Sequence, residues 1–130
     1  MKTKILIAEG ESITAMCIAD VLDSWGYDVC DTVMTGDDAL RVIKMERPGL
    51  AILNVKLRGK MNGIELAGHL IKNFGIPVVF ISGYSDIETR KKAEGTGAAG
   101  YLLKPVEFGL LKSILKETLR KAVNTGAQGG

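Results

Sequence analysis

Ile5-Leu6-Ile7-Ala8-Glu9-Gly10-Glu11 is a run of four apolar residues that ends at an acidic turn containing glycine. After the turn, apolar residues recur at the spacing of one helix face, at positions 15, 18, 19 and 22. A short strand that is apolar on both faces, followed by an amphipathic helix, is typical of a parallel sheet covered by helices.

The same alternation occurs four more times along the chain. Further strand-like runs are found at 27–33, 50–53, 78–81 and 101–103, each followed by a turn and a helical or polar segment. Five such units predict an α/β fold, a doubly wound five-stranded parallel sheet of the flavodoxin-like (βα)5 type with a switch point. We expect one domain over residues 1–123 and a flexible tail over 124–130.

Composition excludes several classes of function. The net charge is only +2, and the basic residues are scattered, which argues against direct nucleic-acid binding. Cys17, Cys30 and His69 lack the spacing of zinc ligands. No apolar run is long enough for a signal peptide or a membrane span, so we expect a cytoplasmic protein without a membrane partner.

Polar side chains follow four of the strands, where a parallel sheet brings strand ends together. Glu9, Asn54, Ser82 and Lys104 should therefore meet in one pocket. Asn54 offers an amide where a carboxylate would be most useful. An amide can form hydrogen bonds but cannot act as a nucleophile.

The order and spacing of several motifs give a family resemblance from about Lys4 to Ala122. The motifs are Ile5 to Glu9, Pro48 before Leu50 to Asn54, Asn62-Gly63-Ile64-Glu65-Leu66-Ala67, Pro77 to Ser82, and Gly97 to Pro105. In these features the chain resembles a receiver domain of two-component response regulators.

The resemblance implies a set of roles for the pocket residues. In that family an aspartate after the third strand accepts a phosphoryl group, and Mg²⁺ bridges it to an acidic pair after the first strand. Carried over, Ser82 and Lys104 bind the phosphoryl oxygens, Tyr101 is the aromatic switch residue, and the backbone carbonyl of Lys56 is a metal ligand. The resemblance also implies a cis Lys104-Pro105 bond.

Two positions depart from the family pattern. Asn54 stands at the phosphoacceptor position, and Gly10 stands where an acid would ligate the metal. Glu9 matches the remaining acid, whereas the direction of the Glu11 side chain is left open. A metal site of Glu9, Asn54 and the Lys56 carbonyl should be weak or absent, because Mg²⁺ prefers anionic oxygens.

These departures predict a pseudo-receiver, not an enzyme, that cannot be phosphorylated at Asn54 and acts through contacts with a sensor histidine kinase or effector protein. A homodimer through residues 86–122 is a further expectation. Three alternatives stay open: a normal phosphoacceptor carrying introduced changes at positions 10 and 54, another acceptor among Glu9, Glu11, Ser82 and Asp86, and a flavodoxin-like domain that binds a small ligand.

Overall fold

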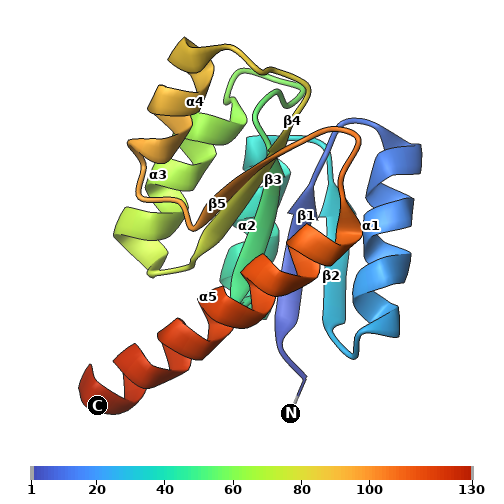
Figure 1. Ribbon diagram of the computed structural model, residues 1–130. Coiled ribbons are helices and arrows are strands. Elements are labelled where there is room, and N and C mark those ends of the chain that lie inside the picture. Colours follow the sequence, from blue (N-terminus) through green and yellow to red (C-terminus); the bar gives the residue numbers. More distant parts are fainter. Residues whose placement is uncertain (1, 130) are drawn as a thin grey trace.

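The computed structural model describes residues 2–129, with side chains described as far as residue 122. Strands and helices alternate along the chain (Figure 1). The strands are β1 (Lys4–Ala8), β2 (Asp28–Val33), β3 (Leu50–Asn54), β4 (Val78–Ser82) and β5 (Gly100–Leu103). The helices are α1 (Ser12–Ser24), α2 (Gly36–Glu46), α3 (Gly63–Phe74), α4 (Ile87–Glu94) and α5 (Phe108–Gly129).

The five strands form one parallel sheet in the order β2-β1-β3-β4-β5. The chain moves outward from β1 to β2, and then returns to the other side of β1 to build β3, β4 and β5. This reversal places the switch point between β1 and β3, whose carboxyl ends are held level by the pairing of Ala8 with Leu53. The fold class predicted from the sequence is confirmed.

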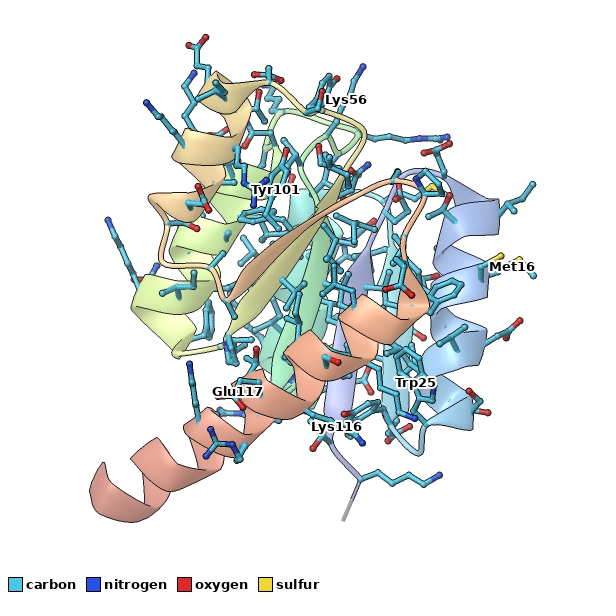
Figure 2. All side chains as sticks on the ribbon, viewed as in Figure 1. Met16, Trp25, Lys56, Tyr101, Lys116 and Glu117 are labelled. Atoms are coloured by element: carbon cyan, nitrogen blue, oxygen red, sulfur yellow. The ribbon has the colours of Figure 1, made fainter. Side chains whose placement is uncertain are left out.

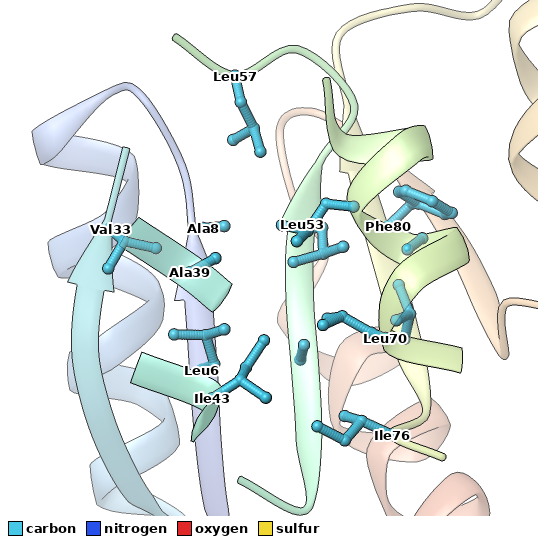
Figure 3. Packing of buried hydrophobic residues seen from close by; sticks show 14 of the residues in the cluster. Leu6, Ala8, Val33, Ala39, Ile43, Leu53, Leu57, Leu70, Ile76 and Phe80 are labelled. Atoms are coloured by element: carbon cyan, nitrogen blue, oxygen red, sulfur yellow. The ribbon is translucent and has the colours of Figure 1, made fainter. Parts of the chain in front are cut away.

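Alternation of side chains along the strands divides the core into two layers. On one face, Leu6, Leu53 and Phe80 belong to a cluster covered by α2 and α3 (Figure 3). The cluster also contains Ala93 of α4. On the other face, the neighbouring strand residues pack against α1 and α5, in a cluster that contains Ile5, Ile7, Ile18, Leu22, Ile52, Ile81, Leu111 and Leu115. Both faces of the central strands are buried, which explains why their sequences are apolar without alternation.

Local signals fix the ends of several helices. The Asn62 side chain accepts from the Glu65 N–H at 2.8 Å, and the Glu65 carboxylate accepts from the Asn62 N–H, so the two form a capping box at the start of α3. Gly75 ends the same helix in the left-handed conformation, with φ 64°. At the end of α2 the left-handed position is taken by Arg47, with φ 49°.

The polar segment expected after β4 forms the eight-residue helix α4, of which only Ala93 is buried. The final helix, α5, extends to Gly129 and so overlaps the tail expected over 124–130. The side chains from 123 onward lie outside the described part, and the tail boundary stays a prediction. No described helix is both long enough and apolar enough to cross a bilayer.

Candidate functional site

The carboxyl ends of the strands bring the predicted pocket residues together. Glu9 directly follows β1, Asn54 is the last residue of β3, and Ser82 is the last residue of β4. All three are buried. Gly63 packs directly on β3, and a Cβ added to it would lie 2.0 Å from the carbonyl oxygen of Asn54. Only glycine allows this close approach, which helps to fix the backbone at position 54.

Glu9 is the centre of the pocket, with a side chain that is fully buried. Its Oε1 accepts a hydrogen bond from the Asn54 amide at 3.0 Å and another from the Glu11 backbone N–H at 3.1 Å. Its Oε2 forms an ion pair with the Lys104 ammonium at 2.8 Å and has no further partner among the described residues. A buried carboxylate is costly unless it is paired; here Oε1 has two hydrogen bonds, whereas Oε2 has only the ion pair with Lys104.

Lys104 holds both acidic residues of the turn after β1. Its Nζ lies 2.8 Å from Glu11 Oε1 as well as 2.8 Å from Glu9 Oε2. Burial is the largest single influence on the pKa of Lys104 and lowers it, but the hydrogen bonds and charges of Glu11 and Glu9 together outweigh it, so the pKa is raised. The contact with Lys104 also lowers the pKa of the exposed Glu11 carboxyl. The direction of Glu11, which the sequence left open, is thus toward Lys104, whose bond to Pro105 is cis as expected.

Ser82 is connected to Tyr101 through the loop after β4. The Ser82 hydroxyl accepts a hydrogen bond from the Tyr84 N–H at 2.9 Å, and the Tyr101 hydroxyl donates to the Tyr84 carbonyl at 2.8 Å. The Tyr101 ring, labelled in Figure 2, packs beside Phe80. The Arg90 guanidinium lies 5.6 Å from the ring centroid. Tyr101 is therefore held half-buried, with its hydroxyl tied to the loop that carries Ser82.

Arg58 is a pocket residue that the sequence did not reveal. It follows β3 in a loop and forms an isolated parallel bridge with Thr35, and its N–H donates to the Met34 carbonyl at 3.0 Å. A Cβ added to Gly10 would lie 3.7 Å from Cγ and 3.8 Å from Nε of Arg58. The arginine side chain therefore lies against the position where a second acid is missing. Spacing alone gives no sign of this, because the contact depends on two loops meeting.

The residues of this pocket do not fit Mg²⁺. A magnesium site needs several oxygen ligands in octahedral geometry, usually with one or two carboxylates. Here Glu9 is already engaged on both oxygens, Asn54 turns its amide nitrogen toward Glu9, and Gly10 supplies no side chain. Within the part of the chain that the structure describes, no three His, Cys, Asp or Glu residues are grouped as metal ligands would be.

Comparison with known proteins places this fold and pocket in a family. Residues 5–116 match the model of the response regulator receiver domain, and the chain belongs to that family. It is 29% identical over 102 residues to the transcriptional regulatory protein PdtaR of Mycobacterium tuberculosis. This aligned region covers 78% of this chain and 49% of PdtaR. It is 31% identical over 118 residues to the transcriptional regulatory protein CrdR of Helicobacter pylori, covering 89% of this chain and 54% of CrdR.

A solved structure agrees with this assignment. The signal receiver domain of a modulated diguanylate cyclase from Desulfovibrio desulfuricans superposes with a TM-score of 0.87 at 30% identity, covering 93% of this chain and 96% of that one. The chain spans about half the length of the two curated relatives named above. The predicted resemblance to receiver domains is confirmed.

Proposed function

We propose that this chain is a receiver-type signalling module that is not phosphorylated at position 54 and acts through protein contacts. The observation that carries the proposal is the hydrogen bond of 3.0 Å from the Asn54 amide to Glu9. In this contact the side chain at the end of β3 is a donor to the acid beside it. An amide in that role offers neither a nucleophilic carboxylate nor an anionic metal ligand.

The other polar groups of the pocket support the same proposal. Lys104, the expected phosphoryl ligand, is held between Glu9 and Glu11. The Ser82 hydroxyl accepts from its own loop. Glu9 and Glu11 share the single ammonium of Lys104, and position 10 supplies no further acid. We therefore infer that Mg²⁺ binds weakly or not at all and that the module has no catalytic activity of its own.

The proposed partners are a sensor histidine kinase or an effector protein in the cytoplasm, with a homodimer as a further possibility. The region 86–122 offers apolar side chains to such contacts, since Ile87 is 71% exposed and Leu103 is 43% exposed. Family membership favours signalling over the binding of a small ligand such as flavin, the alternative left open by the sequence.

The test is the intact mass of the protein after incubation with acetyl phosphate and Mg²⁺. We expect no gain of a phosphoryl group by the chain itself and a gain of one by the double variant Gly10→Asp, Asn54→Asp. The single variant Asn54→Asp, with Gly10 kept, separates the acceptor from the metal ligand. Phosphorylation of the unaltered chain would refute the proposal and would direct attention to Glu9, Glu11, Ser82 or Asp86 as acceptor.

A further inference from the structure

The cavity at the mouth of the pocket lies over Gly10 and next to Arg58. It has a volume of about 380 Å³ and is lined by Glu9, Gly10, Glu11, Asn54, Lys56, Leu57 and Arg58. The loop after β3 supplies two cationic residues, and the turn after β1 supplies two acids. The balance between them decides which kind of ion the cavity accepts.

The two acids of the cavity share one cation, the Lys104 ammonium. Both oxygens of Glu9 are engaged by the chain, and the Glu11 carboxylate is 2.8 Å from the Lys104 ammonium. In contrast, none of the ion pairs found among the described residues involves Lys56 or Arg58. With Glu9 and Glu11 negative and Lys104, Lys56 and Arg58 positive, the five groups carry a net charge of +1, and Lys56 and Arg58 are the cations without an ion pair in the described part of the chain.

The backbone of Arg58 is held before any ligand arrives. Its backbone is held by the bridge to Thr35 and by the hydrogen bond to the Met34 carbonyl. Its side chain lies along Gly10, since a Cβ added there would be in van der Waals contact with Cγ and Nε of Arg58. A guanidinium offers several N–H donors in a planar fork, which suits an oxyanion and repels a metal cation.

We propose that this cavity binds a phosphate-type oxyanion without a divalent metal, through Arg58 and Lys56 over Gly10. The proposed site uses cationic side chains to bind an anion, whereas the site implied by the resemblance at the same place uses acidic side chains to bind a metal cation. The anion would take the position next to Gly10 and leave the buried contacts of Glu9 unchanged. Glu11 is the competing group, because its exposed carboxylate also lines the cavity and could pair with the same cations.

The experiment is a titration of the isotopically labelled chain with inorganic phosphate, followed by backbone amide chemical shifts. It is run in EDTA, with sodium chloride adjusted to hold the ionic strength constant. We expect saturable shifts at Gly10, Lys56 and Arg58 with a dissociation constant in the millimolar range, as for a small ion held by a few charged groups. Adding excess Mg²⁺ in place of EDTA should not increase the affinity.

Matched variants separate this site from general attraction to a positive protein. Arg58→Gln should weaken binding by about tenfold, as expected for a lost charge-assisted contact. Arg58→Lys should retain most of it. Lys116→Gln removes the same charge from an exposed position on α5, at the opposite end of the molecule from Lys56 (Figure 2), and should change the affinity less than twofold. Glu11→Gln should tighten binding.

A parallel titration with phenyl phosphate identifies the source of the oxyanion. Equal affinity for the ester indicates a phosphoryl group carried by another molecule, and preference for inorganic phosphate indicates the free ion; both support the site. Linear shifts without saturation would overturn the proposal, as would equal affinity in Arg58→Gln and the unaltered chain. A strict requirement for Mg²⁺ would overturn it too.

Discussion

Replacing Asn54 with aspartate is expected to destabilise the metal-free protein at neutral pH. The new carboxylate oxygen would take the place of the amide nitrogen that now lies 3.0 Å from Glu9 Oε1. Two unit charges at that distance repel each other by about 5 kcal/mol at an effective dielectric constant of about 20. The introduced group can avoid part of this by taking up a proton, which costs about 4 kcal/mol at pH 7 for an ordinary aspartate.

Lys104 offsets a further part of the repulsion, since its ammonium is 2.8 Å from Glu9. We therefore expect Asn54→Asp to lose about 2–4 kcal/mol of unfolding free energy at pH 7.5. Asn54→Ala, which removes the hydrogen bond without adding charge, should lose about 1–2 kcal/mol and provides the control.

The sign of the pH dependence distinguishes repulsion from lost packing. The carboxyl introduced at position 54 should have a raised pKa in the folded state, so that the folded state binds more protons than the unfolded state. The stability deficit should then shrink as the pH falls from 7.5 toward 4.5. Urea denaturation in EDTA, followed by the fluorescence of Trp25, the single tryptophan, measures these values. Equal stabilities of the aspartate and alanine variants at every pH would refute the reasoning.

Three further predictions concern charges, thiols and backbone strain. The pKa of Lys104 is raised above 10.5 and the pKa of Glu11 is lowered below 4.5. The stabilisation from their contact should therefore be lost when the pH rises through the pKa of Lys104 or falls through the pKa of Glu11. The variant Lys104→Gln should flatten both the alkaline and the acidic limb of a curve of stability against pH. Burial raises the pKa of the Cys30 thiol to about 11, whereas Cys17 is exposed. Brief treatment of the native protein with iodoacetamide at pH 8 should therefore label Cys17 and not Cys30, as measured by mass spectrometry of peptides. Equal labelling of both cysteines would contradict this prediction. Arg47→Gly should raise the unfolding free energy by about 0.5–1 kcal/mol in urea, because the residue has φ 49°; an unchanged midpoint would show that this backbone is not strained.

The sequence predicts the fold well because the strands are buried on both faces. Runs such as Ile5 to Ala8 can be recognised without knowing their neighbours, and glycines such as Gly75 mark where helices end. The polar residue after each strand then predicts the pocket, because a parallel sheet aligns the carboxyl ends. Glu9, Asn54, Ser82 and Lys104 were found in this way and do lie at the expected strand ends.

Contacts between loops could not be predicted in the same way. Arg58 comes close to Gly10 because its loop pairs with Thr35, and this pairing follows no periodic pattern. The direction of Glu11 depends on the position of the Lys104 ammonium across the pocket. Sequence periodicity reports which side of an element faces the core, but it does not report which loop side chains meet.

The contact between Arg58 and Gly10 determines what a carboxylate at position 10 would meet. A carboxylate introduced at position 10 alone would meet the Arg58 guanidinium and pair with it. A carboxylate introduced at position 54 alone would face Glu9 across 3.0 Å without a metal to relieve the repulsion. Each single substitution is expected to gain no chemistry, and the second also loses stability. Under the proposed function the two positions are therefore expected to be coupled, so that neither substitution alone supplies both an acceptor and a metal ligand.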